Sequence, residues 1–93
     1  MTNKYEVALV LSVANGDEAV NALKEKFNDL IAKNGTVENV DEWGNRRLAY
    51  PINDETEGYY VFTTMTSEPS LPAELERIAG ITEGVLRIMV IRK

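Results

Sequence analysis

The sequence predicts an α+β fold in which strands and helices follow one another in the order βαββαβ. Two segments carry apolar residues at helical spacing, and four segments are rich in β-branched and aromatic residues. Turn and cap residues separate these six segments. No internal repeat or linker interrupts the series, so we expect a single domain spanning residues 1–93.

The first strand and the first helix are expected within residues 4–35. Residues 4–13 are largely apolar at both parities, as in a central strand of a sheet. Residues 15–17 supply turn and cap chemistry, and Asn34 and Gly35 should close the helix at its C-terminal cap. The apolar side of this helix comprises Val20, Leu23, Phe27, Leu30 and Ile31.

Residues 36–66 predict an edge strand followed by a central strand. The segment 36–52 is polar and charged, contains Gly44 and runs into Pro51, a combination typical of an edge strand with a β-bulge. Residues 53–58 are expected to form an acidic turn. Residues 59–66 are aromatic and β-branched, so we expect them to pair with the preceding strand as a hairpin.

The last two elements are a short helix and a final strand. Ser70 can cap the helix and Pro72 lies in its first turn. The apolar stripe of the helix, which ends before Gly80, comprises Leu71, Leu75, Ile78 and Ala79. Residues 85–91 are nearly continuous in apolar side chains and should form the last strand.

This order of elements is the split βαβ, or ferredoxin-like, arrangement. Right-handed crossovers place both helices on one face of a four-stranded antiparallel sheet. The first and third strands are then central, and the second and fourth strands lie at the edges. One face of the sheet, the open face, has no covering layer.

Strict alternation along the strands makes this open face unusually apolar. We expect the helix side to carry Val7, Leu9, Leu11, Leu48, Val61, Met65, Leu86, Ile88 and Val90. The open face then carries Ala8, Val10, Arg47, Ala49, Tyr60, Phe62, Arg87, Met89 and Ile91. Monomeric proteins rarely expose an apolar patch of more than roughly a few hundred Å², so we expect a bound partner there, with self-association as the alternative.

Composition excludes several classes of function. The 93 residues contain no cysteine and no histidine, which removes disulfides, thiolate metal sites and the usual general base. The first residues lack the apolar segment of a signal peptide, and no apolar run is long enough to span a membrane, so we expect a cytoplasmic protein. We therefore expect no enzyme activity, cofactor, metal site, membrane contact or small-molecule substrate.

The distribution of charge qualifies what the net charge implies. A net charge of -5, from 10 basic and 15 acidic residues, argues against a nucleic-acid partner. However, most acidic residues lie on the expected helices and turns. The edge strands and the start of the first strand carry a basic set: Lys4, Arg46, Arg47, Arg87, Arg92 and Lys93. Such a local set can contact phosphates, although strand-edge charges also discourage aggregation.

One segment of the chain is specific enough to suggest a family. Residues 43–52 read WGNRRLAYPI, a string that resembles the G-x-R-R-L-A-Y signature of the bacterial ribosomal protein S6 family. The likeness includes KYEV at residues 4–7, Asn34-Gly35, Gly58-Tyr59 and the RIMVIRK ending at residues 87–93. Within the string, Trp43 could stack on a base, but packing across a bulge at Gly44 is the favoured interpretation.

The resemblance implies a structural, non-enzymatic protein of the small ribosomal subunit. It implies binding to small-subunit (16S) ribosomal RNA together with ribosomal protein S18, which would form a heterodimer with this chain and occupy the open face. With the strand alternation, it places Lys4, Arg46, Tyr50, Arg87, Arg92 and Lys93 nearest RNA. It places Val10, Arg47, Ala49, Tyr60, Phe62, Met89 and Ile91 against the protein partner.

Two other classes of protein share this topology. A ligand-binding regulatory module of the ACT-like type would also use an exposed sheet face or edge, but its glycine-containing ligand loop has no counterpart in the sequence. An acylphosphatase-like enzyme needs an arginine in the phosphate-binding loop after the first strand. Residues 12–16 contain no arginine.

Overall fold

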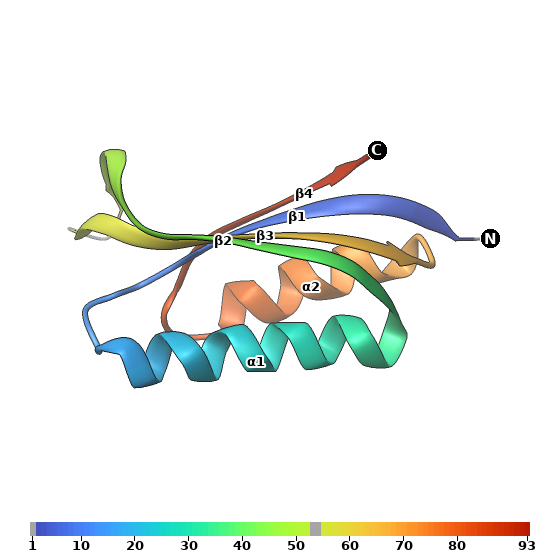
Figure 1. Cartoon of the computed structure of the whole chain (residues 1–93), viewed down its shortest axis with the longest axis horizontal. Helices are drawn as coiled ribbons and strands as arrows, with labels where there is room; N and C mark the ends of the chain where they lie inside the picture. Colours follow the sequence, from blue (N-terminus) through green and yellow to red (C-terminus); the bar gives the residue numbers. More distant parts are fainter. Residues whose placement is uncertain (1, 53–54) are drawn as a thin grey trace.

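The computed structural model describes residues 2–52 and 55–93 and has the predicted order of elements (Figure 1). Its elements are β1 (Asn3–Leu11), α1 (Asp17–Asn34), β2 (Gly35–Ile52), β3 (Glu55–Ser67), α2 (Ser70–Ile81) and β4 (Val85–Arg92). The strands form one antiparallel sheet in the order β2-β3-β1-β4. The central position predicted for the first and third strands is therefore confirmed. Both helices lie on one side of the sheet, and the opposite side is uncovered (Figure 1).

The hydrophobic core lies between the sheet and the two helices. Every second residue of β1 from Tyr5 to Leu11 is buried, as are Val61 and Met65 of β3. The helices contribute Val20, Phe27 and Ile31 from α1 and Leu71, Leu75 and Ala79 from α2. The strand period of two and the helix period of 3.6 thus bring apolar side chains into one layer. Each large apolar side chain in it stabilises the fold by roughly 1.5–3 kcal/mol.

The start of each helix differs in detail from the sequence prediction. The cap position of α1 is Gly16, which has a φ of 90° and makes no side-chain cap hydrogen bond. Ser70 does not cap α2, because it is already the first helical residue and Pro69 occupies the cap position. At the other end of α1, the predicted close at Asn34 and Gly35 is confirmed: the helix ends at Asn34 and Gly35 occupies its C-terminal cap position, in an extended conformation that begins β2.

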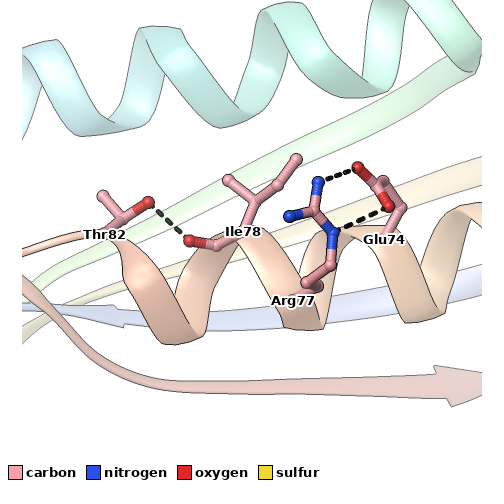
Figure 2. A network of polar contacts seen from close by, with 4 residues as sticks. All are labelled: Glu74, Arg77, Ile78 and Thr82. Atoms are coloured by element: carbon pink, nitrogen blue, oxygen red, sulfur yellow. Dashed lines mark hydrogen bonds and ion pairs between the residues drawn. The ribbon is translucent and has the colours of Figure 1, made fainter.

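The end of α2 is held by side-chain contacts. The helix continues past Gly80, and the Thr82 hydroxyl donates a hydrogen bond of 2.6 Å to the Ile78 carbonyl (Figure 2). One turn earlier, Arg77 Nε donates to Glu74 Oε2 at 3.1 Å (Figure 2). The hydrogen bond from Arg77 lowers the pKa of Glu74. Because this pair is exposed, it adds little stability, and α2 depends mainly on its buried stripe.

The hairpin between β2 and β3 is longer than predicted. β3 begins at Glu55, which pairs with Ile52, so residues 55–58 belong to the strand and not to an acidic turn. The first part of that predicted turn, Asn53 and Asp54, lies outside the described residues. Gly58 of β3 is buried, and a Cβ at this position would lie 2.6 Å from the Val10 Cγ1 atom of β1. The close packing of the Val10 side chain against β3 therefore requires glycine at position 58.

Register shifts on both edge strands break the strict alternation of side chains. β2 shifts against β3 between Val37 and Asn39, between Glu42 and Gly44, and between Arg47 and Ile52. Gly44 has a φ of 79°, so the predicted bulge at this glycine is confirmed. β4 shifts against β1 between Val10 and Leu11.

Two residues predicted to lie on the helix side are placed differently because of these shifts. Leu48 does not face the helices: its side chain lies beside Val10 on the open face, where both would contact a Cβ at Gly58. On β4, Val85 packs against the core where Leu86 was expected. The other helix-side residues of β4, Ile88 and Val90, do pack against the core.

Candidate functional site

The open face contains a hollow of about 380 Å³ at the hairpin end of the sheet. Its lining residues are Ala8, Val10, Leu48, Ala49, Tyr50, Ile52, Tyr60, Phe62, Arg87 and Met89. The far part of β2 curls away from the helices (Figure 1). Leu48, Ala49, Tyr50 and Ile52 of this part form one wall of the hollow, and residues of the central strands form its floor. Val10 is only 6% exposed and belongs to the floor. The hollow is therefore an apolar surface built from all four strands.

Aromatic side chains continue this apolar surface across the bulge in β2. The Trp43 and Phe62 ring centroids are 4.6 Å apart, and those of Phe62 and Tyr60 are 6.3 Å apart. Trp43 also donates from Nε1 to Asp41 Oδ2 at 3.0 Å, yet the residue is 51% exposed. Packing of Trp43 across the bulge is thus confirmed, and half of its surface stays available to a partner.

The two adjacent arginines lie on opposite sides of the sheet. Arg46 pairs with Gly58, whose missing side chain would point to the open face, and its guanidinium lies 5.9 Å from the Trp43 ring centroid. Arg47 pairs with Glu57, the residue before Gly58 on β3, so its side chain points to the helix side. The predicted placement of Arg47 on the open face is therefore wrong, because the bulge at Gly44 reverses the alternation and brings Arg46 there instead.

Most other predicted residues do meet on the open face. Arg87 pairs with Val10 and lines the hollow together with Tyr50, which is 64% exposed, and Met89. Ile91 pairs with Glu6, two residues beyond Met89, and is half exposed outside the hollow. The structure thus brings together the predicted RNA residues Arg46, Tyr50 and Arg87 and most of the predicted partner residues.

The opposite end of the open face is charged and internally paired. Lys4 Nζ lies 3.2 Å from Glu38 Oε1, and Lys93 Nζ lies 3.5 Å from Glu6 Oε2. The Thr66 hydroxyl donates to Glu38, and this hydrogen bond, followed by that from Lys4, lowers the pKa of Glu38. We call Lys4, Glu6, Glu38 and Lys93 the charge-paired end.

The predicted RNA residues therefore fall into two groups. At the charge-paired end, Lys4 and Lys93 have carboxylate partners. Arg92 pairs with Tyr5, so it lies at the same end of the sheet but on the helix side, where it donates to the Asn3 side chain at 3.0 Å. At the hollow, no carboxylate of residues 2–52 and 55–93 forms an ion pair with Arg46 or Arg87. The sequence did not reveal this difference, because carboxylates and lysines on different strands meet only through the strand register.

A second polar cluster joins α1 to the sheet on the helix side. Lys24 Nζ and the Tyr59 hydroxyl both donate to Glu42 Oε1, at 2.6 and 2.9 Å. The hydrogen bond to Glu42 raises the pKa of Lys24, and the bond from Lys24, followed by that from Tyr59, lowers the pKa of Glu42. Lys24 and Glu42 also line a hollow of about 420 Å³ between α1 and the sheet.

The part of the chain that the structure describes offers little for metal or membrane binding. Its His, Cys, Asp and Glu side chains form no group of three or more that could hold a metal ion. None of its helices has the length and apolar character needed to cross a membrane.

Comparison with known proteins identifies the family of this chain. The small ribosomal subunit protein bS6 of Clostridium novyi is 51% identical over 88 residues, covering 94% of this chain and 93% of that protein. The bS6 protein of Alkaliphilus metalliredigens is 49% identical over 90 residues, covering 97% and 96%. The crystal structure of 30S ribosomal protein S6 from Thermotoga maritima has the same fold, with a TM-score of 0.92 and 23% identity over 100% of this chain and 89% of that one. A sequence model of the family described as ribosomal protein S6 matches residues 4–92, and the chain belongs to this family.

Proposed function

We propose that this chain is a structural, non-enzymatic component of the small ribosomal subunit that binds 16S ribosomal RNA together with ribosomal protein S18. Membership in the ribosomal protein S6 family and relatives that are named small ribosomal subunit proteins support the subunit assignment. The observation that carries the finer proposal is the hollow on the open face, with Arg46 and Arg87 beside it.

The apolar part of the open face is proposed to bind the protein partner. Tyr60, Phe62 and Met89 line the hollow with Val10 and Ala49, and Ile91 extends this surface along β4. A hollow with apolar walls fits an inserted apolar side chain, and buried aromatic contacts of this kind dominate interface energetics. Because the hollow has no acidic lining residue among those described, it does not by itself require a basic partner.

The basic residues around the hollow are proposed to contact RNA. Arg46 lies against Trp43, and Tyr50 is largely exposed at the same wall, so cationic and aromatic groups are available together. This combination suits single-stranded or looped RNA, whose phosphates pair with arginine and whose bases stack on aromatic rings. Arg87 would contribute from the other side of the hollow, and Lys4 and Lys93 are proposed to contact RNA from the opposite end of the face. Arg92, which pairs with Tyr5, is proposed to contact RNA at the same end of the sheet but from its helix side.

The net charge of -5 suggests that the partner supplies part of the positive charge. Phosphate binding is dominated by cationic contacts, and this chain offers few of them on one surface. We therefore expect the chain alone to bind 16S RNA weakly and the complex with S18 to bind it tightly.

This expectation can be tested with purified components. The chain, S18 and a 16S RNA fragment are combined singly and together, and complex formation is measured by analytical ultracentrifugation and by filter binding. Formation of a heterodimer, followed by tight RNA binding only when both proteins are present, is the expected result. Failure to associate with S18, together with absence from small subunits after sucrose-gradient sedimentation, would refute the proposal.

A further inference from the structure

The charge-paired end of the open face has an arrangement that the proposed RNA contact does not explain. Lys4 and Lys93 lie at the ends of the two neighbouring strands β1 and β4, and the Lys93 amide donates to the Lys4 carbonyl at 2.9 Å. Each side chain has a carboxylate from the same face within 3.5 Å, namely Glu38 and Glu6. A surface that only collected phosphates would not need these two carboxylates.

The carboxylates are positioned by the sheet and are not incidental neighbours in sequence. Glu38 projects from the bulge between Val37 and Asn39 of β2 and reaches across β3, where the Thr66 hydroxyl donates to it, to meet Lys4 on β1. Glu6 lies on β1 beside Ile91 of β4, and from there its carboxylate meets Lys93. All four charged groups therefore occupy one end of one face.

We infer that Glu6 and Glu38 are specificity-determining residues that occupy Lys4 and Lys93 and so prevent non-specific binding of RNA phosphates at this end of the open face. The inference rests on the proposed RNA-binding function. A carboxylate and a phosphate oxygen compete for the same ammonium donors, and a lysine held by a carboxylate releases fewer counterions when RNA binds. Non-specific RNA contact is thereby restricted to the hollow, where Arg46 and Arg87 have no carboxylate partner among the described residues. Only RNA that displaces Glu6 and Glu38 contacts Lys4 and Lys93.

The lowered pKa of Glu38 supports this assignment. Its hydrogen bonds from Thr66 and Lys4 are the main causes, and the positive charge of Lys93 acts in the same direction. Glu38 is therefore ionised throughout the neutral range and stays a competitor for phosphate. Its side chain is 34% exposed and that of Lys4 is 51% exposed, so RNA can approach the pair from solvent.

The experiment measures non-specific binding with the free protein. Affinity for a fluorescein-labelled oligouridine is determined by fluorescence anisotropy over a range of salt concentrations for the wild type, Glu6→Gln and Glu38→Gln. Glutamine keeps the size of the side chain and can still accept the Thr66 hydrogen bond. Each freed lysine should raise the affinity at low salt by roughly threefold to tenfold and should steepen the salt slope by about 0.7.

Two controls separate this effect from a general change in charge. Glu25→Gln, on α1 at the helix side, changes the net charge by the same amount and should raise affinity far less. Adding Lys4→Gln to Glu38→Gln should abolish the gain. If Glu38→Gln and Glu6→Gln bind oligouridine no better than Glu25→Gln, or if the gain survives Lys4→Gln, the inference is wrong. The assay contains neither S18 nor 16S RNA, so failure of the proposed assembly function would be seen separately.

Discussion

Individual arginines and lysines on the open face differ in what surrounds them. Arg46 lies 5.9 Å from the Trp43 ring centroid, whereas Lys4 lies 3.2 Å from a carboxylate oxygen of Glu38. Stacking on an aromatic ring orients a guanidinium without neutralising its charge, but an ion pair engages the charge itself. At the scale of single residues, the basic residues around the hollow are therefore better prepared to bind phosphate than those at the charge-paired end.

Arg46→Ala and Arg87→Ala are expected to weaken RNA binding by the S18 complex. Each loss of a phosphate contact should reduce the salt slope of binding by about one unit. Lys33→Ala on α1 is the matched control, because it removes the same charge from the helix side. Filter binding over a salt series measures the slopes. Equal slopes for Arg46→Ala, Arg87→Ala and Lys33→Ala would remove the two arginines from the RNA surface.

At the scale of elements, the sequence predicted which segments form strands better than which side chains share a face. The core residues of β1 and β3 were predicted correctly, because central strands pair on both sides and keep their alternation. On β2, the bulge at Gly44 was predicted, but the reversal that it imposes on Arg46, Arg47 and Leu48 was not. A bulge adds one residue to one strand, and only the register of the partner strand shows where the alternation resumes.

Gly44→Ala should destabilise the fold through the backbone alone. Gly44 has a φ of 79°, and no atom lies within 4 Å of the position that a Cβ would take, so the cost is that of a left-handed alanine, about 1 kcal/mol. Gly80→Ala is the contrasting variant, since Gly80 lies inside α2 with equal space around it and the substitution should stabilise the fold by about 0.5–1 kcal/mol. Urea denaturation measures the change in unfolding free energy for both variants. Equal effects of the two substitutions would contradict a strained Gly44.

The contact of α1 with β2 should depend on pH through Glu42. Its pKa is lowered in the folded protein by the hydrogen bonds from Lys24 and Tyr59, from an ordinary value of 4.5. The stabilisation is therefore complete above pH 4.5 and is lost as the pH falls through the lower folded-state pKa. Because the side chain is 44% exposed, Glu42→Gln should cost at most about 1 kcal/mol at neutral pH.

Urea denaturation of Glu42→Gln and the wild type between pH 7 and pH 3 tests this dependence, and we expect the difference in unfolding free energy to shrink toward the acidic end. Glu76→Gln, on the exposed side of α2, controls for the change in net charge. A difference between Glu42→Gln and the wild type that is constant over this range would show that the carboxylate charge is not responsible.

At the scale of the whole molecule, the core and the proposed binding surface lie on opposite sides of one sheet. The helix side holds the core, and the open face holds the hollow and the charge-paired end (Figure 1). The net charge of -5 is a sum over both sides of the sheet, so it does not describe the local charge of either side. Such a division lets an acidic chain expose arginines and aromatic rings on one face without weakening its own core.

Neighbouring residues of β3 allow this division to be tested directly. Val61 is buried in the core and Phe62 lines the hollow, so their side chains point to opposite sides of the same strand. Phe62→Glu should cost about 1 kcal/mol through the lost contact with Trp43 and should abolish S18 binding. Val61→Glu should unfold the protein, because it buries a charge without a partner. Circular dichroism and analytical ultracentrifugation with S18 measure the two outcomes, and unfolding of Phe62→Glu would show that the open face belongs to the core.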